Sequence, residues 1–415
     1  MTRYLFCPPP ERGNTYPTVP VALELQARGH EVVHLTSPDM EPELCLAGLK
    51  CVVKPGGVYG SPKEMTATFM NDWPARLPHE IEELDEVVDS LGTEVIVDGT
   101  HPFAPRLVAE VRGLRHASIF TGAFPIPTQD PMFPFGMGVP PPITEEGRRV
   151  ARLANLVREH DLRDEVAAWD AIRESLGLSP TGRHPWTSVA STDLVLLVST
   201  PALEYPCSDL PDHYWFIGPL LWQPDVPVPP AVAAALETTR PIIYVSQGTT
   251  YNRNPRILLR ALEALGAESI QVIVAVGRAF ESGEFSDAPV NAVIEPFIPF
   301  SAVVSKIHVA VTHAGSGAVH MALAHGIPLV LLPLTGDQPE LAARCVRAGA
   351  AVRLDPMTVG PEELKAAVFT VLNDPAYRAG ARRIMESYAR YDGPRLAADL
   401  LERLPRESGP VIQQR

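Results

Sequence analysis

The sequence predicts an α/β protein made of two doubly wound, Rossmann-like domains that face each other across a cleft. Short apolar runs alternate with helical patterns in both halves, and a proline-rich stretch separates the halves. The length of 415 residues suits two to four domains, at about 100–200 residues each. We expect an N-terminal domain, a linker, a C-terminal domain, and a terminal helix and tail that pack back on the N-terminal domain, at 1–219, 220–238, 239–390 and 391–415.

The first half begins with a strand, a loop, a helix and a second strand. Residues Tyr4–Cys7 are apolar, a proline–glycine loop follows, and a helix is expected to open at Pro17 and end before Gly29. Proline is tolerated in a first helical turn, and glycine suits the left-handed position after a last one. Further strands are expected at 31–36, 95–97 and 117–120, and helices at 77–91 and within 145–177.

A proline-rich linker leads into a second half that is also predicted to alternate strands and helices. Residues Leu220–Pro230 are rich in proline and lack a periodic apolar pattern, which is typical of a linker. The alternation then restarts and predicts a mostly parallel sheet with right-handed crossovers. Strands are expected at 241–246, 271–276, 308–312 and 328–333, and helices at 255–266, 316–325 and 339–348. Open sheets of this kind bind ligands beyond the carboxyl ends of their strands.

Composition and charge exclude several classes of function. Hydrophobic residues make up 46% and charged residues 20%, as in ordinary globular proteins. The net charge of −14 would repel a phosphate backbone, so nucleic acid is not expected as a partner. No apolar run is long enough for a membrane span or resembles a signal peptide, so we expect a cytoplasmic protein.

Cofactor and metal motifs are missing from the sequence. The five cysteines are scattered and have no C-x-x-C spacing, which predicts free thiols instead of disulfides or a zinc site. The first loop has no G-x-G-x-x-G pattern, and the chain has no phosphate-binding G-x-x-x-x-G-K motif. No D-x-D pair is present to hold a divalent metal. We therefore expect neither a bound cofactor nor a metal.

The segment 311–354 is the most informative part of the chain. A predicted strand leads to His313, and a glycine-rich turn then opens directly into a helix, which leaves the first backbone N–H groups free to bind phosphate. A turn that only serves helix–strand packing is the alternative interpretation. The next strand is followed by Asp337 and Gln338, which should lie at the same edge of the sheet.

This segment resembles the donor-binding signature of the inverting glycosyltransferases of the GT-B fold. That family includes bacterial antibiotic and macrolide glycosyltransferases and plant UDP-sugar glycosyltransferases. The resemblance extends over most of the chain, with matching segments at Arg28–Val32, Ile217–Pro219, Ser246–Thr249 and Glu295–Pro299. It implies an N-terminal acceptor-binding domain and a C-terminal nucleotide-sugar-binding domain, with the nucleotide sugar as co-substrate.

The resemblance also implies a set of donor-binding residues, namely His313, Gly315, Ser316, Gly317, Ala318, Thr249, Phe297, Ile298, Asp337 and Gln338. The segment 313–318 and Thr249 would contact the diphosphate, and Phe297 would stack on the pyrimidine beside the backbone of Ile298. The pair Asp337 and Gln338 would bind sugar hydroxyls. Alternatives remain open for three of them, since Phe297 also suits a core, Thr249 a helix cap and Asp337 an N-cap.

One departure from the family pattern concerns the donor. Where many UDP-sugar members carry a glutamate for the ribose hydroxyls, this chain has Met321, which accepts no such hydrogen bond. Deoxythymidine diphosphate lacks the 2′-hydroxyl, so a dTDP-sugar is favoured over a UDP-sugar.

A second departure concerns the base. The catalytic histidine of the family is replaced by Asn14, a neutral amide that cannot take a proton. Asp98 matches the aspartate that orients that histidine, and Asp98, His101 and Glu11 are the candidate bases. His101 also suits a surface loop, and Asp98 a loop cap or an ion pair. General base catalysis contributes about 10²–10⁴-fold, so an acidic nucleophile such as a phenol, enol, hydroxylamine or amide nitrogen fits this site best.

The stretch 124–142 is rich in proline, phenylalanine and methionine and suits an adaptable loop over an apolar acceptor, or else a plain proline-stiffened connection. The sequence therefore predicts an inverting, metal-independent glycosyltransferase that moves a (deoxy)sugar to a largely apolar natural-product aglycone. A catalytically silent sugar-nucleotide-binding protein and an epimerase on the same architecture are the alternatives. The expected partners are the aglycone and the nucleotide sugar, and a homodimer is compatible with the sequence.

Overall fold

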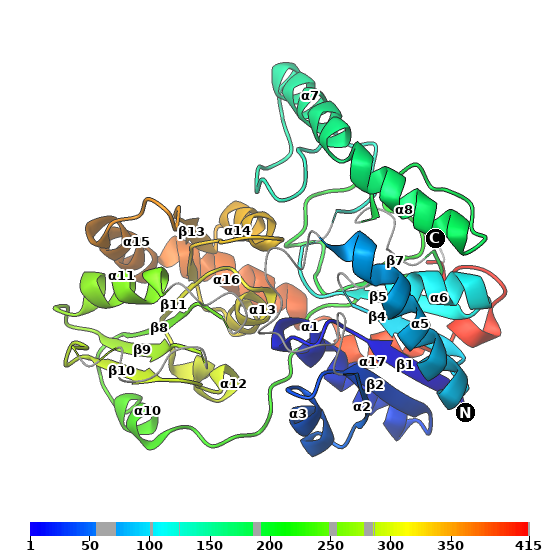
Figure 1. Ribbon diagram of the computed structural model, residues 1–415. Coiled ribbons are helices and arrows are strands. Elements are labelled where there is room, and N and C mark those ends of the chain that lie inside the picture. Colours follow the sequence, from blue (N-terminus) through cyan, green and yellow to red (C-terminus); the bar gives the residue numbers. More distant parts are fainter. Residues whose placement is uncertain are drawn as a thin grey trace.

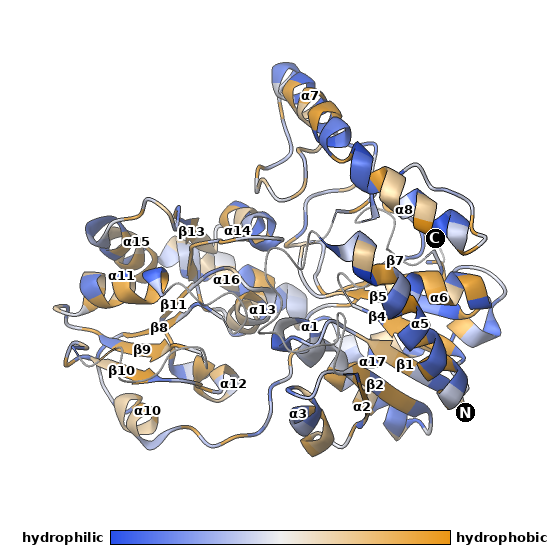
Figure 2. Cartoon of the chain, in the orientation of Figure 1, coloured by the Kyte–Doolittle hydropathy of each residue, from blue (hydrophilic) through white to orange (hydrophobic). Residues whose placement is uncertain are grey.

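A computed structural model of the chain describes residues 1–54, 72–99, 103–123, 125–185, 192–248, 255–277, 285 and 287–413. Two parallel sheets lie side by side, and helices cover both faces of each (Figure 1). The strands are mostly apolar, whereas most helices have one apolar and one polar side (Figure 2). This arrangement confirms the predicted α/β class with two doubly wound sheets.

The described N-terminal residues form a seven-stranded sheet in the order β3-β2-β1-β4-β5-β6-β7. Its strands are β1 (Arg3–Cys7), β2 (Glu31–Thr36), β3 (Lys50–Val53), β4 (Val95–Asp98), β5 (Arg115–Phe120), β6 (Leu194–Leu197) and β7 (Tyr214–Phe216). The accompanying helices are α1 (Arg12–Thr15), the 3₁₀ turn η1 (Tyr16–Thr18), α2 (Val19–Ala27), α3 (Glu41–Leu46), α5 (Trp73–Leu91), α6 (Ala104–Arg112), α7 (Glu145–Asp161) and α8 (Arg163–Ser175).

The described C-terminal residues form a six-stranded sheet in the order β10-β9-β8-β11-β12-β13. Its strands are β8 (Ile242–Ser246), β9 (Gln271–Ala275), β10 (Ala292–Glu295), β11 (Val309–Thr312), β12 (Leu329–Leu331) and β13 (Ala351–Arg353). The helices are α10 (Pro230–Ala235), α11 (Arg256–Leu265), α12 (Phe300–Val303), η5 (Val304–Lys306), α13 (Ser316–Ala324), α14 (Gln338–Arg347), α15 (Pro361–Asn373), α16 (Pro375–Tyr388), α17 (Gly393–Leu401) and η6 (Leu404–Arg406).

Each sheet buries a different core on each face. Side chains alternate along a strand, so Tyr4 packs with α2 and α17 while Leu5 packs with α5, α6 and α8. In the C-terminal sheet, α11 and α15 cover one face and α13, α14 and α16 the other. The order of the C-terminal sheet repeats that of β3 to β6 in the N-terminal sheet, which has β7 in addition. The switch points lie between β1 and β4 and between β8 and β11.

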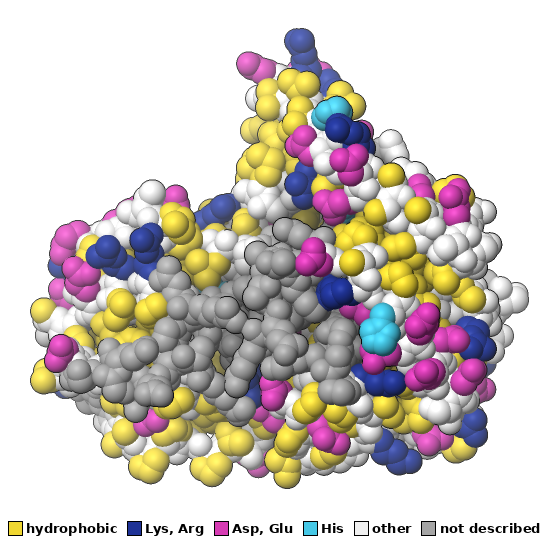
Figure 3. Space-filling view, in the orientation of Figure 1, with side chains coloured by type: hydrophobic (Ala, Val, Ile, Leu, Met, Phe, Trp, Pro, Cys, Tyr) yellow, Lys and Arg dark blue, Asp and Glu magenta, His cyan; other side chains and the backbone are white. Residues whose placement is uncertain are grey.

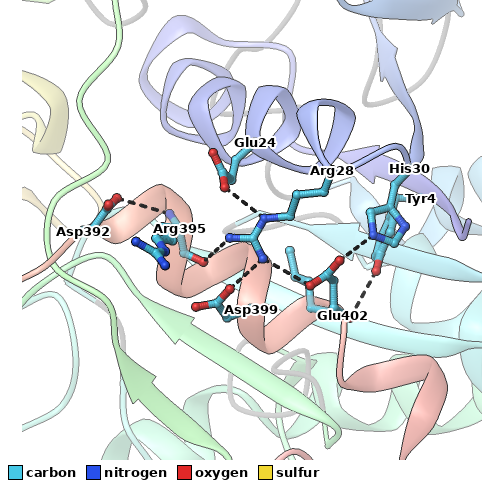
Figure 4. Close-up of polar contacts among 9 residues, drawn as sticks. Tyr4, Glu24, Arg28, His30, Asp392, Arg395, Asp399 and Glu402 are labelled. Atoms are coloured by element: carbon cyan, nitrogen blue, oxygen red, sulfur yellow. Dashed lines mark hydrogen bonds and ion pairs between the residues drawn. The ribbon is translucent and has the colours of Figure 1, made fainter.

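Helix α17 returns to the N-terminal sheet, where Arg28 anchors it (Figure 4). The guanidinium donates to Glu24, Asp399 and Glu402 at 2.9, 2.6 and 3.1 Å. Nearby, the hydroxyl of Tyr4 donates to the Leu401 carbonyl at 3.2 Å. The last residues of the chain therefore complete the core of the first domain.

The structure corrects several local predictions. Helix α2 begins at Val19, because Pro17 lies in the preceding 3₁₀ turn. The predicted linker contains α10, whose Val232 is fully buried in the C-terminal core. The short strands β3, β7, β10 and β13, near the sheet edges, and the buried β6 were not predicted. Edge strands of three or four residues give little periodic signal.

A buried ion pair network joins the two domains. Arg344 of α14 donates to Glu204 at 2.6 Å and to Glu340 at 3.1 Å, and all three side chains are buried. The guanidinium also lies 4.5 Å from the ring centroid of Tyr205. On the same helix, Arg347 donates to backbone carbonyls of the 202–204 segment. These contacts fix the orientation of the C-terminal domain against the N-terminal one.

Helix α7 projects from the body of the molecule (Figure 1). Apolar side chains remain exposed along it and just before it, as Figure 3 shows: Ile143, Val150, Leu153, Leu156 and Val157. Within the described residues, no helix combines the length and the apolar character that a membrane crossing requires.

Replacing Arg344 by methionine should lower the free energy of unfolding by about 3–5 kcal/mol, because Glu204 and Glu340 would stay buried without their counter-charge. Thermal and urea unfolding measure this loss. The control is Arg152→Met, since Arg152 lies on exposed α7 and should change stability by less than about 1 kcal/mol. Equal unfolding midpoints for Arg344→Met and wild type would show that the network does not hold the domains.

Candidate active site

One large cavity lies where the carboxyl ends of the two sheets face each other. Its volume is about 2090 Å³, and described residues of both domains line it. Loops after β1 and β5 form one wall, and loops after β11 and β12 form the opposite wall. The switch points of both sheets are at this edge, which is where doubly wound folds bind ligands.

The ring of His313 is enclosed by two glycines. A Cβ atom added to Gly248 would lie 2.5 Å from Cε1 of the ring, and one added to Gly315 would lie 2.5 Å from Nε2. The ring donates to the backbone carbonyl of Ser246, and Nδ1 lies 3.2 Å from Oγ1 of Thr312. Burial lowers the pKa of His313 to about 4, so the imidazole is neutral at pH 7 before a ligand binds.

The turn from β11 into α13 brings backbone amides to the cavity wall. Ala314 has a φ of +67°, and no other described residue except glycine has a positive φ. Gly315 occupies the N-cap position without a side-chain cap, which leaves the amides of the first turn for a ligand. Gly315, Ser316, Gly317 and Ala318 all line the cavity. An uncapped helix N-terminus favours a bound anion.

Asp337 reaches from the C-terminal domain to the N-terminal domain. It stands at the N-cap position of α14, but its side chain makes no capping hydrogen bond. A Cβ atom on Gly122 would lie 1.8 Å from Oδ2 of Asp337, so only glycine lets the carboxylate approach the backbone there. Burial raises the pKa of Asp337 to about 6, and hydrogen bonds from its own amide and that of Ala123 oppose the rise.

Three other predicted donor-binding residues lie at the cavity, and one is outside the described residues. Gln338, Phe297 and Ile298 line the same cavity. Gln338 accepts hydrogen bonds through Oε1 from the amides of Leu334 and Thr335 at 2.8 and 3.1 Å, so this oxygen orders the loop after β12. Phe297 is only half-buried, whereas Ile298 is packed into the core. Two predicted residues, Thr249 and His101, lie outside the described residues.

The loop after β1 places Asn14 and Glu11 on the opposite wall of the cavity. Nδ2 of Asn14 donates to Oε2 of Glu11 at 3.3 Å, and Oδ1 of Asn14 accepts from the hydroxyl of Thr121 at 3.5 Å. Burial raises the pKa of Glu11 to about 7, and the hydrogen bond from Asn14 partly opposes this.

Asp98 lies at the end of β4, is buried and is not part of the cavity lining. Its role as a catalytic residue stays a prediction. Its Oδ2 is 2.9 Å from Nε2 of His116 on the neighbouring strand β5. Asp98 points to the same face of the sheet as Ile96 and His116, toward α6.

The loop 125–142 combines an apolar lining with polar anchors. Pro125, Ile126, Met132, Phe133 and Phe135 line the cavity. Oε1 of Glu340 accepts from the amides of Gly136 and Gly138 at 3.0 and 2.8 Å, and Arg353 donates to the Gly138 carbonyl at 2.7 Å. The loop is therefore attached to the C-terminal domain while its apolar side chains face the cavity. Phe124, the first residue of the predicted stretch, lies outside the described residues.

A cluster of Asp130, Cys207 and Asp209 has the donor types that a metal needs. Its carboxylates already accept hydrogen bonds, Asp130 from the amide and hydroxyl of Ser208 and Asp209 from the amide of Gln129. These bonds tie the loop 125–142 to the segment after β6, so the cluster serves as a loop anchor.

Sequence reasoning missed Gly122, Thr121 and Glu340, which connect the two walls. The sequence signal was a glycine two residues after the predicted strand 117–120. Contacts between loops of separate domains leave no periodic pattern in either segment.

Comparison with known proteins yields consistent matches. The model of the UDP-glucoronosyl and UDP-glucosyl transferase family matches residues 149–394. The 4'-demethylrebeccamycin synthase of Lentzea aerocolonigenes is 32% identical over 422 residues, which cover 97% of this chain and 99% of that protein.

Solved structures share the fold at lower identity. The glycosyltransferase of kitacinnamycin has a TM-score of 0.76 and 24% identity, and the match covers 97% of this chain and 99% of that one. The spinosyn rhamnosyltransferase complexed with thymidine diphosphate has a TM-score of 0.72 and 21% identity, with coverage of 97% and 100%. These likenesses confirm the predicted GT-B fold.

Replacing Gly248 by alanine should displace the His313 ring, because the added methyl group would overlap it and because the φ of +81° suits glycine. We expect nucleotide diphosphate affinity to fall at least tenfold, measured by isothermal titration calorimetry. Gly360→Ala is the matched control, since nothing lies within 4 Å of its added Cβ atom and the residue is outside the cavity lining. Unchanged affinity in Gly248→Ala would contradict the role assigned to the enclosed ring.

Proposed function

Because the chain belongs to the UDP-glucoronosyl and UDP-glucosyl transferase family and is a glycosyltransferase, we propose that its cavity joins a deoxysugar to a largely apolar aglycone. The donor is a thymidine diphosphate sugar in preference to a uridine diphosphate sugar, and transfer inverts the anomeric carbon without a metal. The observation that carries this proposal is the uncapped N-terminus of α13 beside His313, which faces the loop of the N-terminal domain across one cavity.

The wall formed by β11 and α13 suits a diphosphate. Amides of Ser316, Gly317 and Ala318 supply fixed donors, and the helix dipole favours negative charge. His313 already donates one N–H to the carbonyl of Ser246. A diphosphate next to the ring would favour the protonated imidazole, which has a second N–H to donate. These groups stabilise the charge that develops on the leaving diphosphate.

The preference for a deoxynucleotide is supported by Met321. Its side chain is buried in the core of the C-terminal domain and lines the cavity. A thioether provides no strong acceptor for a ribose hydroxyl, so a donor without the 2′-hydroxyl loses nothing there. The similar fold of a rhamnosyltransferase complexed with thymidine diphosphate agrees with this preference.

The acceptor side of the cavity supports a largely apolar aglycone. The loop 125–142 contributes aromatic, proline and methionine side chains, which adapt to a ring system. Its attachment to Glu340 and Arg353 keeps these side chains close to the donor-binding domain. Direct attack by the acceptor on the face opposite the diphosphate inverts the anomeric carbon.

Thermal unfolding with dTDP, UDP and GDP tests the donor preference. At about 100 times its dissociation constant, a ligand stabilises the protein by about 2.7 kcal/mol, so dTDP should raise the melting temperature most. The shift should be the same with and without added Mg²⁺. A larger shift with UDP would contradict the preference, and no response to any nucleotide would favour a catalytically silent protein.

Replacing His313 by alanine should weaken dTDP binding about 10–100-fold, because a charge-assisted hydrogen bond contributes about 1.5–3 kcal/mol. Calorimetric titration gives the affinity, and circular dichroism checks the fold. His325→Ala is the control, since His325 is exposed at the end of the same helix and is outside the cavity lining. If both variants bind dTDP as the wild type does, the role of His313 is wrong.

A further inference from the structure

We infer that Glu11 is the general base of the transfer reaction and that Asn14 positions its carboxylate. This inference rests on the proposed function. It assigns the proton transfer to the residue three positions before the asparagine that replaces the family's histidine.

The backbone around Glu11 is fixed on both sides. The amide of Glu11 donates to the Pro9 carbonyl at 2.7 Å, and its own carbonyl accepts from the amides of Asn14 and Thr15 at 3.0 and 2.8 Å. The buried hydroxyl of Thr15 also donates to Pro9 at 2.9 Å. Glu11 therefore stands at the start of α1 in a defined place, at the carboxyl end of β1.

Among the described residues, the Glu11 carboxylate accepts one side-chain hydrogen bond. Oε2 accepts it from Nδ2 of Asn14 at 3.3 Å, and Oε1 is the other carboxylate oxygen. Asn14 is itself oriented by Thr121, whose hydroxyl donates to Oδ1. The Asn14 amide cannot take a proton itself, but its hydrogen bond orients the Glu11 carboxylate that takes it.

Charged groups near Glu11 are engaged elsewhere. Arg12 donates to Glu43 and to the Tyr16 hydroxyl, and Tyr16 donates to Glu43 at 2.7 Å. On the opposite wall stand His313, neutral before a ligand binds, and Asp337. Desolvation by burial raises the pKa of the half-buried Glu11 to about 7, the range in which a general base works best.

The position of Glu11 relative to the donor site follows from Thr121 and Gly122. Thr121 contacts Asn14, and the next residue, Gly122, packs against the opposite domain. A Cβ atom on Gly122 would lie 1.8 Å from Oδ2 of Asp337 and 3.7 Å from Cβ of Ser316. The Glu11–Asn14 pair and the N-terminus of α13 are thus separated by one strand-end loop, with the cavity between them.

In the transfer step, Glu11 takes the proton of the acceptor and the diphosphate takes the electron pair of the broken bond. The acceptor O–H gives its proton to Oε1 of Glu11 as the oxygen lone pair forms the bond to the anomeric carbon. The bond from that carbon to the diphosphate oxygen breaks, and its electron pair leaves with the diphosphate toward His313 and α13. Glu11 then releases the proton to solvent.

The test compares wild type with Glu11→Gln, using dTDP-glucose and UDP-glucose as donors and ring-substituted phenols of decreasing pKa as acceptor probes. For the least acidic phenol we expect a 10²–10⁴-fold lower kcat, roughly the contribution of a general base. The loss should shrink as the phenol becomes more acidic, and dTDP affinity should stay unchanged. Wild-type kcat/KM should fall as the pH drops below about 7, since the protonated base is inactive, and this fall should disappear in the variant.

The control is Glu41→Gln, the same chemical change on nearby α3 and outside the cavity lining; it should behave as wild type. An equal loss for all phenols, or a pH profile unchanged in Glu11→Gln, would overturn the inference while leaving the transfer reaction intact. A wild type that binds no nucleotide would instead contradict the proposed function.

A second measurement needs no acceptor. Carbon-13 NMR of protein labelled at glutamate carboxyls assigns Glu11 by the signal that Glu11→Gln lacks. A titration midpoint near 7 supports the inference, and a midpoint near the ordinary glutamate value overturns it. In Asn14→Ala the midpoint should rise further, because the hydrogen bond from Asn14 favours the charged carboxylate.

Discussion

The buried guanidinium of Arg344 decides how the two domains face each other. It pairs with Glu204 of the N-terminal domain and with Glu340 of its own helix. Glu340 also accepts from the amides of Gly136 and Gly138, so the same network attaches the apolar loop to the donor-binding domain. Separating a buried charge of this kind from its partners costs about 3–5 kcal/mol. The width of the cavity therefore depends on ionic contacts between side chains of its own wall.

Most of the fold could be predicted because its strands and helices carry strong local patterns. The strand 31–36 and the helix that begins at Ser316 agree with the structure, since apolar alternation and a glycine turn mark them. The strands β7 and β13 were missed because three residues at or near a sheet edge give no period. Helix α10 was missed because two consecutive prolines conceal a helix that starts at the second of them.

The position of the candidate site could be predicted where a short sequence motif also sets the backbone, as at His313 and the first turn of α13. It was not predictable where the direction of a side chain decides. Asp98 lies at the end of a strand that borders the switch point, yet the alternation of β4 turns it to the face of Ile96 and toward His116. No residue near Asp98 in the sequence signals this partner, because the pairing with β5 sets it. The contact between Gly122 and Asp337 likewise depends on how two separate domains meet.

The return of α17 to the first sheet affects when the first domain can complete its fold. A ribosome releases the N-terminal strands first, and domains generally begin to fold in that order. The face that carries Tyr4 and Leu25 is incompletely covered until Ala397 and Leu401 have been synthesised. The nascent first domain must therefore wait, with an apolar face open to water, for the whole second domain to be translated. Completion of its core therefore follows synthesis of the segment 239–390, which lies between its sheet and α17 in the chain.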